Sequence, residues 1–168
     1  MKIRIKHTAL IFFLLFCIPV MNSCQSDDVV QIFTGKKWQL TYITGKDNND
    51  IYDFWNGDAT AKKASLAYVN KDNNFTVSFT GTATNNIIKG NMTGNVLNTS
   101  FSGTWLANGE TGKFSSIITN SGDETDSLAV NFLKGLNSAT SYKGDINNLY
   151  LYYKSGNRTL RMTFHTAN

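Results

Sequence analysis

Few side chains in this sequence have the type and spacing that catalysis or metal binding requires. His165 is the one histidine beyond the first 23 residues, and it lies close to the C-terminal end. A single histidine without neighbouring ligands cannot form a typical zinc site. No Gly-x-Ser-x-Gly, P-loop or dinucleotide-binding pattern occurs. We therefore expect no enzymatic activity and no metal or other cofactor.

Acidic residues gather at Asp123, Glu124 and Asp126, where paired carboxylates could act as acid and base or bind calcium. They precede an apolar stripe at helical spacing, and the dipole of a helix stabilises acids at its N-terminus. Segments 47–50 and 72–74 have the composition of turns and lack the Gly and Glu of an EF-hand loop. Helix-start and turn chemistry explains all these residues, so none predicts a metal site.

Four aromatic residues are candidates for ligand binding. Tyr52 and Trp55 lie in a loop with several aspartates, and Tyr150 and Tyr152 alternate with apolar neighbours, so they face away from Leu149. Exposed rings can stack on a glycan or a small apolar ligand while nearby polar groups bind hydroxyls. The same rings could instead complete the core, and the sequence leaves this choice open.

The N-terminus has the three-part form of a secretory signal. Lys2, Arg4 and Lys6 precede an apolar run over 9–20, and small or polar residues follow before Cys24. The run is shorter than the roughly 20 apolar residues that a membrane-spanning helix needs. We expect residues 1–23 to be a signal peptide that is removed after export.

Segment 20–24 resembles a relaxed lipobox, which implies that Cys24 becomes an acylated N-terminus. The alternative is an ordinary signal with an incidental cysteine. Two or more acyl chains hold a protein stably on a membrane. The residues after Cys24 resemble sorting signals for the outer membrane and, in Bacteroidetes-type lipoproteins, for the cell surface; they are Gln25, Ser26, Asp27 and Asp28. The expected location is the outer membrane, facing outward or otherwise facing the periplasm.

The charge of the mature chain is nearly balanced. The full sequence has 16 basic and 12 acidic residues and a formal net charge of +4. Loss of the three leader cations leaves 13 basic side chains against 12 acidic ones, a net charge of +1. This balance argues against nucleic acid as a partner. Cys17 leaves with the leader, so Cys24 is the one remaining cysteine and no intramolecular disulfide can form.

Period-2 alternation dominates the remaining chain and predicts short antiparallel strands. Residues 24–34 are expected to form a polar tether whose apolar patch, 29–33, begins the fold, and 35–168 to form one domain. Segment 51–63 is expected to be irregular, and 66–70 to form a hairpin with 75–80. The other predicted strands cover 37–44, 86–92, 96–106, 113–119, 149–154 and 159–165.

One amphipathic helix is predicted over about 126–136, because Leu128, Phe132 and Leu136 share a face. Asn137 is expected to be its left-handed cap. Asp126, Ser127 and Leu128 also resemble a Bacteroidetes-type O-glycosylation acceptor, although a helix start explains them. The predicted fold class is mainly β, a single antiparallel β-barrel-like or curved-sheet domain of seven to nine short strands with one helix.

A set of aromatic, glycine and leucine motifs resembles the META domain of HslJ-like lipoproteins. The motifs are Trp38-Gln39-Leu40, Phe101-Ser102-Gly103-Thr104-Trp105, Asn131 to Leu136, Leu149-Tyr150-Leu151 and Leu160 to Phe164. The resemblance covers about 70 residues, from near Asn98 to Phe164, and implies a small curved-sheet fold in the cell envelope. The family's Gly-Cys-Asn motif is missing, which indicates a divergent relative or an uncharacterised lipocalin-like lipoprotein family.

Together these features predict a lipid-anchored cell-envelope protein with a non-enzymatic structural or interaction role. Its partners would be the membrane, through Cys24, and an envelope protein. The alternative is a lipocalin-like binding module for a small apolar ligand or a glycan.

Overall fold

The computed structural model describes residues 25–167, so the predicted leader and Cys24 lie outside the described residues. In chain order the elements are α2 (Gln25–Phe33), β1 (Lys37–Gly45), α3 (Ala59–Val69), β2 (Thr76–Thr84), β3 (Ile87–Asn95), β4 (Ser100–Asn108), β5 (Phe114–Ser121), α4 (Ser127–Ser138), β6 (Ala139–Gly144), β7 (Asn148–Ser155) and β8 (Arg158–Thr166). The described chain is thus mainly β, as predicted.

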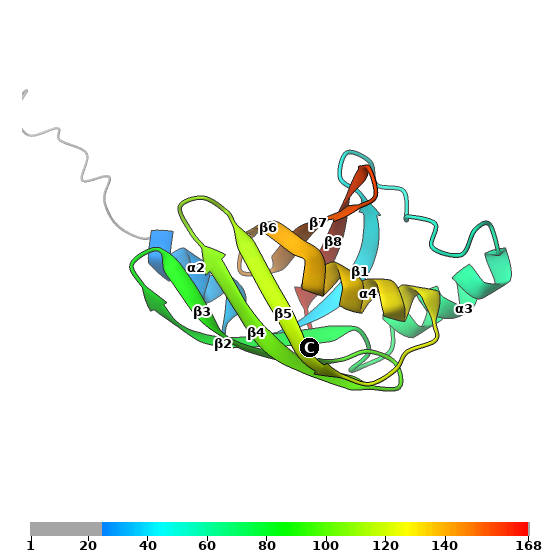
Figure 1. The fold of residues 1–168 in the computed structure, drawn as a ribbon, viewed down its shortest axis with the longest axis horizontal. Helices are drawn as coiled ribbons and strands as arrows, with labels where there is room; N and C mark the ends of the chain where they lie inside the picture. The colour runs from blue at the N-terminus through cyan, green and yellow to red at the C-terminus, as the bar shows by residue number, and fades with distance from the viewer. Residues whose placement is uncertain (1–24, 168) are drawn as a thin grey trace, which may run out of the picture.

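All eight strands belong to one antiparallel sheet in the order β5-β4-β3-β2-β1-β8-β7-β6. Strands β2 to β5 are joined by short turns, and β6 to β8 form a second run of the same kind. The first and last strands pair at the centre, where Leu40 lies opposite Phe164. The curled sheet surrounds the core, and α2 and α3 lie at opposite ends of the molecule (Figure 1).

The sheet curls until its edge strands approach each other, but it does not close. At one end the Tyr142 amide donates to the Gly112 carbonyl at 2.9 Å. Farther along, α4 lies between the two edges, and its Leu136 carbonyl accepts from the Ser116 hydroxyl at 2.6 Å. Asn137 Oδ1 accepts from the Ile118 amide of β5 at 2.9 Å. Helix α4 therefore occupies the gap and satisfies polar groups of an edge strand.

Helix α4 begins and packs as the apolar stripe predicts, at Ser127, with Leu128, Phe132 and Leu136 buried. Gly135 permits its close approach to the sheet, because a Cβ there would lie 2.7 Å from Met162 Sδ. The expected left-handed cap at Asn137 is wrong, since the helix continues to Ser138 and Asn137 instead binds β5 through its side chain.

The described chain has two helices, α2 and α3, in addition to the one helix that the sequence predicts. The predicted strand at 66–70 is wrong, because these residues continue or follow α3. Asp58 caps α3 by accepting from the Thr60 and Ala61 amides, and four alanines favour the helix. Only Ser65 and Val69 of α3 are buried, so the sequence has no strong apolar stripe to reveal it.

The segment expected to be a polar tether forms α2 from Gln25 onward, and its apolar patch begins the fold as predicted. Phe33 is fully buried, and its ring centroid lies 4.7–5.6 Å from those of four other rings, Phe79, Trp105, Phe114 and Tyr142. Helix α2 therefore fills one end of the curled sheet with an aromatic cluster.

Replacing Phe33 with Ala should lower the free energy of unfolding by about 3–5 kcal/mol, because it leaves a cavity inside this cluster. Denaturant unfolding measures the change. The Val130→Ala variant, at a side chain that is 44% exposed, is the control and should change stability by less than about 0.5 kcal/mol. A Phe33→Ala chain as stable as the unmodified one would show that α2 does not support the core.

Candidate functional site

The described residues contain no group of three or more His, Cys, Asp or Glu side chains that could hold a metal ion. His165 is an exposed residue near the end of β8, and its Nδ1 lies 2.9 Å from the Thr41 hydroxyl. Asp123 is also exposed, whereas Glu124 and Asp126 are partly buried and bound to neighbouring segments. The three acids therefore do not form a joint carboxylate site.

Glu124 binds the turn between β3 and β4. Its Oε1 accepts from the Leu97, Asn98 and Thr99 amides at 3.0–3.1 Å and from the Thr99 hydroxyl at 2.9 Å. Burial alone would raise the pKa of Glu124, but these hydrogen bonds together outweigh it and hold the pKa below its ordinary value. This carboxylate holds a turn in place.

Trp55 belongs to the core rather than to an exposed surface, because only 6% of it is exposed. Its Nε1 donates to the Ser65 hydroxyl at 2.8 Å, and that hydroxyl donates to Asp126 Oδ2 at 2.5 Å. Asp126 Oδ1 also caps α4 through the Leu128 and Ala129 amides. The acid thus joins α3, α4 and the loop that carries Trp55.

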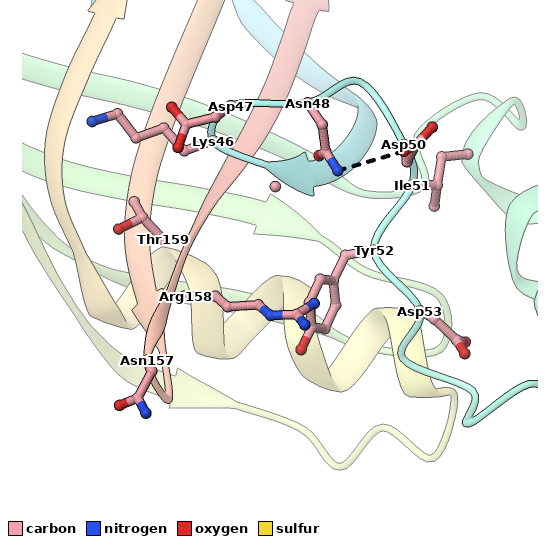
Figure 2. Close-up of a pocket in the computed structure, with 11 residues that line it drawn as sticks. Lys46, Asp47, Asn48, Asp50, Ile51, Tyr52, Asp53, Asn157, Arg158 and Thr159 are labelled. Carbon is pink, nitrogen blue, oxygen red and sulfur yellow. Dashed lines mark hydrogen bonds between the residues drawn. The ribbon is translucent and has the colours of Figure 1, made fainter.

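Tyr52 lines an open hollow of about 770 Å³ between the loop after β1 and the turn that joins β7 to β8. Figure 2 shows Arg158 directed toward the Tyr52 ring, and its guanidinium lies 5.9 Å from the ring centroid. In this view Lys46 and Thr159 extend away from the Tyr52 ring (Figure 2). The hollow is lined mainly by polar residues, so it differs from a lipocalin-type apolar cavity.

Tyr150 and Tyr152 are half-buried and lie on the outer side of the sheet, opposite to buried Leu149 and Leu151, as the alternation predicts. The register adds Tyr42 on the same side, because Tyr42 and Tyr150 both lie opposite Thr163. Tyr152 lies opposite Arg161, whose guanidinium is 5.9 Å from the Tyr150 ring centroid. We call Tyr42, Tyr150, Tyr152 and Arg161 the tyrosine face.

The tyrosine face is connected to the hollow through Arg161. Arg161 Nη2 donates to Asn49 Oδ1, in the loop after β1, at 2.9 Å. Burial raises the pKa of the Tyr152 hydroxyl, and the nearby Arg161 charge partly offsets that rise. A guanidinium and three phenol rings therefore lie together on one strand surface.

Acidic residues are absent from the sheet itself. Between residues 25 and 167, none of the eight strands contains Asp or Glu. Around the tyrosine face, Lys143 lies opposite Tyr150, Lys154 lies opposite Thr159, and the Lys46 amide binds the Thr159 carbonyl. The outer side of β1, β8, β7 and β6 is therefore basic and aromatic.

The core side of the sheet is filled by large side chains. Trp38, Phe75, Phe132 and Phe164 are fully buried there. The hollow that Tyr52 lines is open to the outside of the described fold. A ligand would meet this molecule on its outer surface or at its rim. Within residues 25–167, no helix has the length and apolar character needed to cross a membrane.

Sequence reasoning missed Tyr42, Arg158 and Arg161 as members of these surfaces. Alternation along β8 predicts that the Arg161 side chain points to the side of the sheet opposite to Leu160 and Met162. It could not show that β1 and β8, more than 100 residues apart in the chain, are neighbours. A bulge near Thr41 also shifts Tyr42 relative to simple alternation from Trp38.

The fold and these surfaces define a class of small curled antiparallel β domain with a filled core and a polar outer side. The chain belongs to the DUF4847 family, a domain of unknown function whose model matches residues 24–166. It is similar to the crystal structure of a DUF4847 family protein from Bacteroides vulgatus ATCC 8482. That likeness has a TM-score of 0.61 and 26% identity over 82% of this chain and 96% of the other. Comparison with curated proteins finds no match.

The sequence resemblance to the META domain is therefore wrong, because the family found is DUF4847. The motifs that suggested it serve general packing needs. Phe101 and Trp105 fill the inside of β4, and Leu149 and Leu151 fill the inside of β7. Any curved sheet with a packed helix can require such patterns, so they discriminate poorly between families.

Replacing Glu124 with Ala should lower the free energy of unfolding by about 1–2 kcal/mol near pH 7, because three amides lose their acceptor. The folded-state pKa of Glu124 is depressed, so its stabilising contribution is present above its unfolded-state pKa and lost as pH falls through its folded-state pKa. Unfolding measured near pH 7 and about pH 3 should show a smaller acid-induced loss in the variant than in the unmodified chain.

The exposed neighbour Asp123 provides the control, and the Asp123→Ala variant should follow the unmodified chain at both pH values. Equal acid-induced losses in the Glu124→Ala variant and the unmodified chain would contradict the role assigned to Glu124.

Proposed function

We propose that this chain is a lipid-anchored cell-envelope protein with a non-enzymatic interaction role at the outer membrane. The observation that carries the proposal is the position of α2, which begins at Gln25, directly after the predicted acylation site at Cys24. Val29 and Phe33 of α2 are buried in the core. An acyl anchor on Cys24 would hold the domain close to the bilayer, with little free linker between them.

Two further observations support this proposal. The apolar run over 9–20, with its preceding cations, has the form of an export signal. The similar structure comes from a Bacteroides protein, which agrees with the Bacteroidetes-type pattern that follows Cys24. We therefore assign Gln25, Ser26, Asp27 and Asp28 to sorting toward the cell surface.

Replacing Cys24 with Ser should abolish incorporation of an alkyne-labelled palmitate and release the protein from the membrane fraction, because no thiol remains for acylation. Both are measured in cells that express the full chain. Cys17→Ser is the matched control, since it removes the other cysteine and should leave labelling intact. Labelling that persists in the Cys24→Ser chain would contradict the anchor.

Surface display should depend on Asp27 and Asp28. In intact cells, added protease should degrade the unmodified protein, and replacement of both aspartates with Ala should protect it while acylation continues. Asp123→Ala is the control, because this exposed acid lies far along the chain from the sorting segment. Protection of the unmodified protein from protease would place it on the periplasmic side instead.

A second candidate function, binding of a glycan, is favoured by one observation, the grouping of three tyrosines and an arginine outside the sheet. The filled core gives less support to an apolar ligand held inside, as in a lipocalin. The binding role is therefore assigned to the outer surface.

A further inference from the structure

We propose that the tyrosine face, with the lysines around it, binds an acidic polysaccharide, one whose sugars carry carboxylate groups. The inference rests on the proposed interaction role and gives that role a ligand class. Three properties of the face carry it, namely its rings, its charge and its unpartnered polar atoms.

The rings form a platform that can contact several sugars. Tyr42 and Tyr150 lie on strands separated by β8, so their Cα atoms are about 10 Å apart. Tyr152 is two residues from Tyr150 on the same side of β7. All three rings are half-buried, so the packing that holds them also leaves part of each ring open to stacking. An extended chain of sugars matches this arrangement better than a single small molecule.

The charge of the face selects an acidic partner. Arg161 lies among the tyrosines, and exposed Lys143 and Lys154 lie on the neighbouring strands β6 and β7. Lys46 lies at the rim, in the hollow that Asp47, Asp50 and Asp53 also line. The four strands β1, β8, β7 and β6 contain no carboxylate, so nothing on these strands neutralises the cations. By contrast, the strands β2 to β5 contain Lys89 as their one charged residue. Charge complementarity therefore favours carboxylated sugars at the tyrosine face.

The polar atoms beneath the rings have unused hydrogen-bonding capacity. Within the described residues, Thr44 Oγ1, Thr163 Oγ1 and Arg161 Nε are buried without a hydrogen-bond partner. Thr163 lies between Tyr42 and Tyr150 in the register, and Thr44 lies opposite Arg161. Buried polar groups normally have partners. A small displacement of the rings by a bound sugar would let its hydroxyls and carboxylate reach these atoms.

The test uses the full chain, expressed from residue 1 and purified in a neutral detergent. Affinity electrophoresis in native gels containing polygalacturonate should retard the protein, and dextran, a neutral polymer, should not. The double variant Lys143→Gln, Lys154→Gln should bind polygalacturonate about tenfold more weakly, the loss expected when charged hydrogen bonds are removed. The Tyr152→Ala variant should weaken binding to a similar degree.

Matched controls separate a site from general attraction of charge. Lys63→Gln with Lys134→Gln removes the same charge from exposed helix positions, and Tyr68→Ala removes an exposed ring from α3. Both should bind like the unmodified chain, and circular dichroism should show every variant folded. Equal weakening in the matched controls, or no retardation of the unmodified chain by polygalacturonate, would overturn the proposal.

A membrane surface is the other anionic occupant to test. Vesicles of phosphatidylcholine with phosphatidylglycerol should compete poorly with polygalacturonate for a face built on tyrosine stacking. Binding to such vesicles that equals binding to polygalacturonate and survives Tyr152→Ala would assign the face to lipid instead. Palmitate labelling of Cys24 is measured separately, so failure of the anchor and failure of the glycan site give different results.

Discussion

The structure depends on how the unpaired backbone groups at the two edges of a curled, unclosed sheet are bonded or covered. Strand β6 comes close enough to the turn before β5 for the bond between Tyr142 and Gly112, but β5 and β6 do not pair along their length. Helix α4 occupies the rest of the gap, with Asn137 supplying an acceptor to β5. Unpaired strand edges expose backbone groups that must be bonded or covered. This requirement places α4 between the edges and brings its apolar stripe into the core.

The same constraint determines where the molecule can interact with others. Helix α2 fills one end of the curl with Phe33, and α4 fills the gap with Phe132. Because large rings fill the core side, the side chains available to a partner are those on the outer side and the rim. There the strands lack carboxylates, and Arg161 contacts both a tyrosine ring and the rim loop. The interaction chemistry is therefore concentrated on one half of the sheet.

Parts of the fold could be predicted because their signals are local. Alternation identified most strands, and the stripe that contains Leu128 and Phe132 identified α4. Helix α3 escaped prediction because it buries little and depends on an Asp58 cap and alanine propensity. Trp55 was a candidate for ligand binding because aspartates surround it in the sequence. In the structure a hydrogen bond to Ser65 holds it in the core. This bond joins the loop that carries Trp55 to helix α3, and the local sequence of neither segment predicts that the two are in contact.

The β class, helix α4 and the direction in which Tyr150 and Tyr152 face could be predicted from the sequence, because each follows from the period of apolar residues along one element. The tertiary structure alone decided that β1 pairs with β8, and so that Tyr42 and Arg161 join those tyrosines. Strand register depends on packing, and on hydrogen bonding at the sheet edges, between segments that are distant in the chain. No local sequence pattern contains that information.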